Sequence, residues 1–527
     1  MVFMLRWRAS FATGSLLWSR CIATTSVQQE LAARDHQPTA ATAARPTHEI
    51  PGPKTYPIIG TIMAFIKMME LSKDRDAVLK MWMNMIEHYG PIIHLKQPGI
   101  GQFVTLVRPE DIETVMLSTM EDPIRYGLEV IQKIRKTAPG NYFEKKCGIV
   151  TENGEEWRRV RSKVQKPTMR PKNVTSYLTR MDQVTLDFID RIAAWQAERG
   201  EMPKDFQTEL YKWAFESTCL MVLNRRMGCL DPDVAQDSDP MRFITIATDH
   251  LSAMHDTLMT LPFWKLYRTS SYKRLEKTHH SLLQIADRNI RKAEEALLSK
   301  DPDEGEDDFS LLQTLLLTPG LTHKDVYTYM FDLLSGSIHT TSHTIGFTLY
   351  LLARHPEVQA RLQEELDNVL GDHQGPLTPK HLAQLSYLKT IIKESLRIFP
   401  VMAGSVRLLN RDVVLSGYMV PKGYKALILN HLSGWDEKYF PQADKFIPER
   451  WLRHKPLGPI HPYASLPFGT GTRMCIARRI AEQEMYTFLA RVMHRFTIHY
   501  KYEDMQAELC LLYRPSLPLK FNFSERK

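Results

Sequence analysis

Cysteine is scarce in this 527-residue chain, and its six cysteines are not spaced as a disulfide framework. Disulfide-rich secreted modules gather many cysteines in a short chain, so this usage argues against such a module and favours a reducing compartment. No second Cys or His stands near Cys475 at the spacing of a zinc finger, which argues against structural zinc. The cysteines are Cys21, Cys147, Cys219, Cys229, Cys475 and Cys510.

Long apolar runs are also missing, because no segment offers the roughly eighteen uninterrupted apolar residues that a membrane-spanning helix needs. Acidic residues are absent before Glu30, whereas this stretch contains arginines and many Ser, Thr and Ala residues. Such a composition is typical of a mitochondrial transit peptide, and the arginines interrupt the rival interpretation, an N-terminal membrane anchor. We predict a transit peptide over residues 1–46 and one large domain over residues 47–527.

No internal repeat or linker-like break divides the rest of the chain, and its hydrophobic (43%) and charged (24%) fractions are ordinary for a globular protein with a large core. The residue pattern predicts mainly helix, with short strands near Ile92 to Val107 and Leu409 to Ile428. Val326 to Leu352 is weakly charged throughout and predicts a core helix. Ser299 to Asp308 has no apolar residue and predicts a solvated loop. The expected fold class is mainly α with small β-sheets (α+β).

One cysteine stands in an unusual context. Cys475 follows a Gly-containing loop that begins at Phe468, and it immediately precedes a long amphipathic stretch. Gly469 and Gly471 allow backbone conformations that a residue with a Cβ resists, so the loop can approach a flat cofactor closely. A helix N-terminus beyond Cys475 would favour the anionic thiolate. A single sulfur ligand in such a loop fits axial ligation of haem iron, and a buried structural cysteine at a helix start is the alternative.

This loop and two upstream motifs resemble the cytochrome P450 superfamily of haem-thiolate monooxygenases. The loop matches the family pattern FxxGxRxCxG, except that Ala477 replaces the final Gly. Glu394 and Arg397 match ExxR, whose i, i+3 spacing places both on one helical face, and Arg450 lies in a segment like the family's PERW. The similarity extends from about Pro51 to the C-terminus. It implies a triangular, helix-rich domain around a buried haem.

The resemblance also implies the contacts of that haem. Cys475 would be the axial thiolate ligand of haem b, and basic and indole groups would bind the propionates. The residues of ExxR and PERW (Glu394, Arg397 and Arg450) would form a buried cluster behind the haem loop, where buried charge is tolerated only when it is paired. The remaining cofactor contacts implied are Phe468 and Arg473 of the loop, Trp157 and Arg161 of a WxxxR motif, and Arg407.

The segment Gly336-Ser337-Ile338-His339-Thr340-Thr341 resembles the family's oxygen-activation motif, A/G-G-x-D/E-T-T/S. Thr340 matches the threonine that contacts dioxygen, although a threonine inside a helix can simply bond back to its own helix. His339 replaces the acid of the motif. Imidazole can relay protons near neutral pH, so His339 is either a proton relay or a packed core residue.

No flavin or nicotinamide fingerprint is recognisable, so electrons would come from a partner protein. Lys389 and Lys393 lie at i, i+4 spacing and resemble the ferredoxin-docking lysines of mitochondrial family members. Arg478 and Arg479 add positive charge near Cys475, and the formal net charge is +8. The implied system is an adrenodoxin-like ferredoxin with an NADPH-ferredoxin reductase, acting on a monomer peripherally associated with the matrix side of the inner mitochondrial membrane. No nucleic-acid partner is expected.

Segments that resemble the family's substrate-pocket walls are mainly apolar, which suits a hydrophobic, weakly polar molecule. Stretches over Pro123 to Asn141 and Asn173 to Asp187 look most like invertebrate mitochondrial members of the family. The first interpretation is hydroxylation of a steroid- or sterol-like substrate with O2. The alternatives are a mitochondrial monooxygenase acting on foreign compounds, a haem-thiolate isomerase or lyase that needs no external electrons, and a haem-binding redox sensor or carrier.

Overall fold

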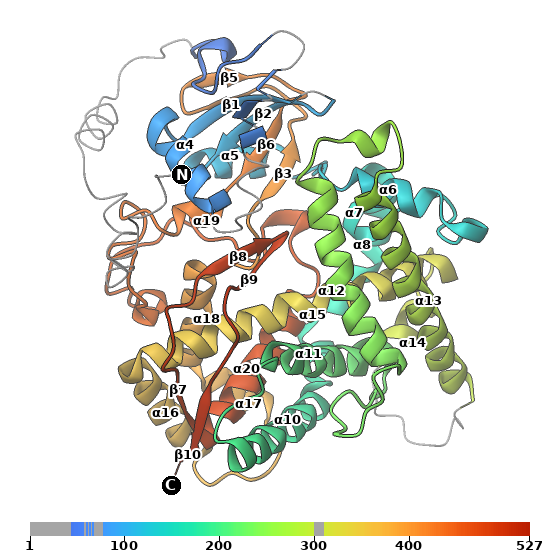
Figure 1. The fold of residues 1–527 in the computed structure, drawn as a ribbon, viewed down its shortest axis with the longest axis vertical. Helices are drawn as coiled ribbons and strands as arrows, with labels where there is room; N and C mark the ends of the chain where they lie inside the picture. Colours follow the sequence, from blue (N-terminus) through green and yellow to red (C-terminus); the bar gives the residue numbers. More distant parts are fainter. Residues whose placement is uncertain are drawn as a thin grey trace, which may run out of the picture.

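The computed structural model describes residues 44–56, 60–61, 63–64, 66–67, 77–97, 99–299 and 310–526. These residues form a helix-rich body with small sheets, so the predicted fold class is confirmed. Figure 1 shows the largest sheet at one end of the molecule, and most of the helices packed below it and to its side.

Helices build most of the body, and one of them crosses its centre. Helix α15 (His323–Arg354) contains the predicted core helix, and Thr322 and Asp325 form a capping box at its start. Most of its residues are buried, as its weakly charged sequence predicted, and α11 packs along it (Figure 1). The other helices of four or more residues are α4 (Ala77–Tyr89), α5 (Pro109–Ser118), α6 (Glu129–Lys136), α7 (Gly148–Thr151), α8 (Gly154–Met169), α9 (Pro171–Thr175), α10 (Leu178–Arg199), α11 (Phe206–Leu223), α12 (Asp239–Leu258), α13 (Ser270–Leu298), α14 (Leu311–Leu316), α16 (Pro356–Leu370), α17 (Pro379–Gln384), α18 (Ser386–Ile398), α19 (Asn430–Ser433), η4 (Pro448–Trp451) and α20 (Arg478–Arg495).

The largest sheet has the strand order β1-β2-β6-β3. β2 pairs antiparallel with β1 and parallel with β6, and β6 pairs antiparallel with β3. Both predicted strand regions contribute to it, and the remaining strands form three two-stranded sheets. The bounds are β1 (Ile92–Gln97), β2 (Gly101–Leu106), β3 (Ser405–Leu408), β4 (Val413–Leu415), β5 (Tyr418–Val420), β6 (Lys425–Ile428), β7 (Phe496–His499), β8 (Ala507–Cys510), β9 (Leu512–Pro515) and β10 (Asn522–Glu525).

Two large apolar clusters share α15. One joins it to α10, α16, α18 and α20, and the other joins it to α8, α11, α12, α13 and α14. Because the helix contributes to both, its position relative to α20 is fixed by packing from two sides. The two ends of the loop from Phe468 to Ala477, called here the haem-type loop, are thereby held against the central helix.

Some sequence-based expectations fall on other parts of the chain. Most of the predicted transit peptide (residues 1–43) and nearly all of the acidic stretch (residues 300–308) lie outside the described residues. Gly52 is described and lies against β1, where a side chain would collide with the carbonyl of His94. Within the part of the chain that the structure describes, no helix has both the length and the hydropathy needed to span a membrane.

Candidate functional site

The loop before α20 holds Cys475 in a bent backbone. Gly469 and Gly471 adopt φ values of 68° and 70°, the left-handed region that glycine enters without strain. The amide of Cys475 donates to the carbonyl of Phe468 at 2.8 Å, which closes the loop. The guanidinium of Arg478 lies 5.5 Å from the centroid of the Phe468 ring. The two glycines therefore have the conformational role that the sequence indicated.

Cys475 is an exposed residue, but the surrounding protein partly desolvates its thiol. That desolvation is the largest influence on the thiol and raises its pKa. A hydrogen bond from the backbone of Ala477 and the positive charges of Arg161 and Arg125 act in the opposite direction. The surroundings therefore supply part of the stabilisation of a thiolate, and a bound metal ion would supply the rest.

The three charged residues of ExxR and PERW form one buried cluster. The Glu394 carboxylate accepts from Arg397 Nη2 and from Arg450 Nε, both at 2.8 Å. The side chains are 0–1% exposed. Arg397 also donates to the carbonyls of Gly434 and Ala443 at 2.6 and 2.8 Å, and Trp451 Nε1 donates to Glu394 at 2.8 Å. The carboxylate is therefore fully paired, and these charges hold its pKa below the usual value.

A second group of cations lies near Cys475. Trp157 and Arg161 are both buried on α8, as their i, i+4 spacing predicted. The guanidinium of Arg473 lies 4.2 Å from the centroid of the Trp157 ring. Arg161 Nη2 donates to the carbonyl of Met474 at 3.0 Å, and Arg407 on β3 is 4% exposed.

Arg473 is held mainly by main-chain oxygens. Its Nε donates to the carbonyl of Pro123 and its Nη1 to the carbonyl of Ile149, each at 3.1 Å, and its Nη2 donates to the carbonyl of Glu152 and to Asn153 Oδ1. Burial and the neighbouring arginines lower its pKa to about 8. The sequence predicted that Arg473 binds a propionate. In the structure its guanidinium joins the haem-type loop to two distant segments, one at Pro123 and one from Ile149 to Asn153.

Sequence reasoning missed a fourth arginine of this group. Arg125 pairs with Arg407 through an isolated antiparallel bridge, and its charge acts on both Arg473 and Cys475. Its Nη1 donates to the carbonyl of Val150 at 3.1 Å. Arg125 belongs to no motif, so the sequence carries no signal for its role; only the folded chain brings it to Cys475.

This donor set fits a dianionic, flat, iron-bearing group. Arg125, Arg161, Arg407 and Arg473 make no ion pair with a carboxylate among the described residues, although buried cations are normally paired. Trp157 Nε1 is a buried donor without an acceptor in that part of the protein. No group of three or more His, Cys, Asp or Glu that could hold a metal ion occurs there either. A haem would bring two propionates to the arginines and the indole, and iron to the single thiol.

The predicted oxygen-activation residues lie in the middle of α15 and face different ways. Thr340 is half-buried, and its hydroxyl donates to the carbonyl of Gly336 at 2.9 Å. His339 is 5% exposed; its Nε2 lies 3.1 Å from Thr248 Oγ1 on α12, and its ring packs 4.8 Å from the Tyr211 ring on α11. Burial lowers the pKa of His339 to about 4. The imidazole is therefore neutral at physiological pH.

A buried acid beneath this segment was also missed. Glu484 on α20 is 3% exposed, and its Oε1 has no hydrogen-bond partner in the described chain. The hydroxyls of Ser217 and Thr341 face it, but burial dominates and raises its pKa to about 8. A signal existed in the sequence, because Glu484 interrupts a stripe of buried apolar residues at four-residue spacing, Ile480 and Phe488.

The two lysines predicted to dock a partner lie on α18 but differ in exposure. Lys393 is exposed, whereas Lys389 is half-buried and its Nζ donates to the carbonyl of Ala383 at 3.0 Å. Burial lowers the pKa of Lys389. Of the two lysines, only Lys393 is therefore a fully solvated cation. The bond from Lys389 to Ala383 also connects the start of α18 to α17.

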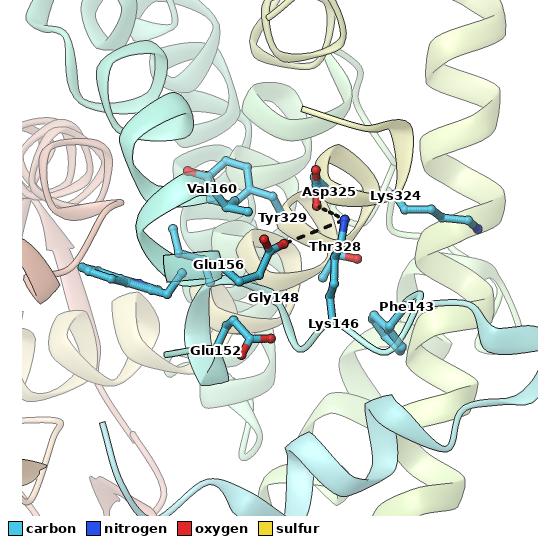
Figure 2. Close-up of a pocket in the computed structure, with 12 residues that line it drawn as sticks. Phe143, Lys146, Gly148, Glu152, Glu156, Val160, Lys324, Asp325, Thr328 and Tyr329 are labelled. Atoms are coloured by element: carbon cyan, nitrogen blue, oxygen red, sulfur yellow. Dashed lines mark hydrogen bonds and ion pairs between the residues drawn. The ribbon is translucent and has the colours of Figure 1, made fainter. Parts of the chain in front are cut away.

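A separate small pocket of about 20 Å³ lies between α8 and the start of α15 and does not include Cys475. Figure 2 shows Lys146 within it, joined to Glu156 and Asp325. Lys146 Nζ lies 3.8 Å from Glu156 Oε1 and 3.3 Å from Asp325 Oδ1, so the lysine and the two carboxylates offset each other's charge. Trp157 forms part of the wall, which places the pocket beside the arginine group.

Comparisons with known proteins agree with this geometry. The cytochrome P450 family model matches residues 50–523. Three similar proteins of Drosophila melanogaster are "Probable cytochrome P450 301a1, mitochondrial" (31% identical, covering 94% of this chain and 90% of that protein), "Probable cytochrome P450 12a5, mitochondrial" (32%, covering 83% and 84%) and "Cytochrome P450 302a1, mitochondrial" (31%, covering 92% and 97%). The chain belongs to the cytochrome P450 family and is a haem-dependent monooxygenase.

Proposed function

We propose that this monooxygenase works in mitochondria and hydroxylates a hydrophobic, steroid- or sterol-like substrate, using O2 and electrons that pass from NADPH through a ferredoxin reductase and a ferredoxin. The observation that carries the proposal is the meeting of one exposed cysteine, Cys475, with four arginines that lack carboxylate partners in the described chain. The similarity to relatives named mitochondrial supports the location. A leader over residues 1–46 and a catalytic domain over residues 47–527 belong to the same proposal.

Each residue of the site has a distinct task. Cys475 would provide the thiolate ligand of the haem iron, Trp157, Arg161 and Arg407 would bind the propionates, and Phe468 would pack at the loop. Arg125 joins this set because it bridges Arg407. When bound, the haem supplies the redox chemistry that inserts one oxygen atom into a C–H bond. The buried cluster of Glu394, Arg397 and Arg450 holds the backbone behind the loop.

Proton supply is the task of the α15 segment. The Thr340 hydroxyl is half-buried and can hold or pass a proton at its Oγ1. His339 carries a neutral imidazole, so it can pass a proton only by accepting it at one nitrogen while releasing another. Its hydrogen bond to Thr248 also supports the simpler role of fixing α12 against α15.

Electron supply depends on positive charge near the thiolate. Lys393 on α18 and Arg479 on α20 are exposed, and α18 contacts α20. A small acidic ferredoxin is complementary to this surface, and electrostatic complementarity mainly accelerates the encounter. Peripheral attachment to the matrix side of the inner membrane would bring the enzyme, its electron donors and a hydrophobic substrate together.

The decisive experiment combines a spectrum with turnover. Purified protein, reduced and treated with carbon monoxide, should show the red-shifted absorption of thiolate-ligated haem, and Cys475→His should lose it. Ferredoxin, its reductase and NADPH should then support oxygen consumption and a hydroxylated product from a sterol or steroid panel. Hydroxylation of foreign compounds alone would reassign the substrate class. Conversion of a lipid hydroperoxide without reductant would point to an isomerase or lyase, and haem binding without any turnover to a sensor or carrier.

A further inference from the structure

Asn153 stands at the N-cap position of α8, where asparagine is among the most favoured residues. Its side chain makes no capping hydrogen bond there. Omitting a cap costs helix stability. The amide group is instead directed at two arginines that lie far away in the sequence, Arg125 and Arg473.

Those contacts use both ends of the amide. Asn153 Oδ1 accepts from the backbone N–H of Arg125 at 2.9 Å and from Arg473 Nη2, and Asn153 Nδ2 donates to the backbone carbonyl of Arg125 at 3.0 Å. The side chain therefore pairs with Arg125 as a neighbouring strand would, with one bond in each direction. Such two-sided pairing fixes the orientation of the Arg125 peptide unit, which a single bond would leave free to rotate.

Three chain segments meet at this one amide: residues 123–125, the start of α8, and the haem-type loop. Arg473 strengthens the junction by donating to Pro123 and Ile149, and Arg125 continues it to β3 through its bridge with Arg407. Burial, and then repulsion from neighbouring arginines, lowers the pKa values of Arg473 and Arg407. Main-chain carbonyls accept from both guanidinium groups, and Asn153 adds an uncharged side chain that contacts Arg473 and the backbone of Arg125.

We propose that Asn153 is a positioning residue of the haem site, which orients Arg125 toward one propionate and locks Arg473 to the same segment. The inference rests on the proposed function, because it needs a dianionic haem to complete the arginine group. A neutral amide suits the task better than a carboxylate would. Aspartate keeps both acceptor contacts, but it loses the donor to the Arg125 carbonyl and places a negative charge among cations that are reserved for the propionates.

The test measures how firmly the haem-loaded protein holds its cofactor, by following haem transfer to excess apomyoglobin. Asn153→Ala and Asn153→Asp should each accelerate haem loss by tenfold or more. Asn173→Ala is the matched control, because Asn173 is a similarly half-buried asparagine whose Nδ2 donates to the carbonyl of Pro167 at 2.9 Å, and its haem loss should match the wild type.

A double-mutant comparison separates positioning from general destabilisation. Because Asn153 acts partly through Arg125, the double variant Asn153→Ala with Arg125→Ala should lose haem more slowly than the two single effects together predict. Fully additive effects, or wild-type haem retention in Asn153→Ala, would overturn the inference. Where Asn153→Ala fails to fold, Asn153→Asp decides, and wild-type retention in that variant refutes the inference. A wild-type protein without a thiolate-type spectrum would instead refute the proposed function.

Discussion

The guanidinium of Arg473 stacks on the indole of Trp157, 4.2 Å from the ring centroid, while Trp157 Nε1 has no acceptor among the described residues. The ring and the N–H group therefore do separate things. The ring supports Arg473 through a cation–π contact, and the N–H group remains available to donate to a ligand.

Trp157→Phe tests that separation. The variant keeps an aromatic face for Arg473 and removes only a donor that has no protein partner, so the unfolding free energy of the haem-free protein should change by less than about 1 kcal/mol. Haem loss to apomyoglobin should accelerate several-fold. Trp213→Phe is the opposite case, because Trp213 Nε1 bonds Thr185 Oγ1 at 3.3 Å in the core. It should lower stability and leave haem retention unchanged; unchanged haem loss in Trp157→Phe would contradict the assignment.

Glu394→Gln should be among the most destabilising single substitutions in the chain. It leaves Arg397 and Arg450 buried without a counter-charge, and breaking a buried ion pair typically costs about 3–5 kcal/mol. Denaturant unfolding of the haem-free protein would measure the loss. Asp504→Ala, which removes an exposed pair with Arg354, should cost less than about 1 kcal/mol. Equal effects of the two substitutions would show that the buried cluster contributes no more to stability than an exposed ion pair does.

How much of the site the sequence could predict depends on how far apart in the chain the contacting residues lie. The bent loop at Gly469 and Gly471 and the shared helical face of Glu394 and Arg397 are local, so the sequence predicted both, and the family resemblance implied that the two charges pair. The partners of Arg473 are more than 300 residues away in the chain, at Pro123 and Ile149. No periodicity records such a meeting, and for that reason Arg125 and Asn153 went unrecognised.

His339 shows a second limit of sequence reasoning. Its place in the motif left two roles open, a proton relay and a packed core residue, because the pKa of a histidine depends on what packs around it. Here α11 and α12 bring Tyr211 and Thr248 against the ring and exclude water, which lowers the pKa to about 4. The long core helix itself was predictable, because nearly every position of α15 is apolar or uncharged.

Because the His339 ring is neutral, we can predict how the coupling of oxygen consumption to product formation depends on pH. With a pKa near 4, His339 does not titrate between pH 6 and pH 8, so the ratio of product to hydrogen peroxide should show no inflection near 6.5. His339→Asp should keep the thiolate-type spectrum and change this ratio at every pH. An unchanged ratio would remove His339 from proton supply, and an inflection near 6.5 that disappears in the variant would show that the ring titrates.

Partner docking should depend on Lys393 more than on its neighbour. Lys393→Glu should raise the KM for ferredoxin several-fold and leave substrate binding unchanged, because the side chain is exposed and bears no structural contact in the described chain. Added salt should weaken docking of the wild type, since the Debye length is only about 10 Å at 0.1 M. Lys273→Glu, an equal charge change on the distant helix α13, is the control. Equal effects of the two variants would mean that net charge alone governs the encounter.

Glu484 should make stability fall with rising pH. Burial raises the pKa of its carboxyl from 4.5 to about 8, so between these values the folded chain keeps a proton that the unfolded chain releases. Over this window folding loses about 1.4 kcal/mol per pH unit from this group, and below and above the window the contribution is constant. Glu484→Gln removes the titration and preserves the shape. Denaturant unfolding should therefore find the variant increasingly more stable than the wild type from pH 5 to pH 8. Parallel pH profiles would show that the carboxyl is ionised in the folded chain.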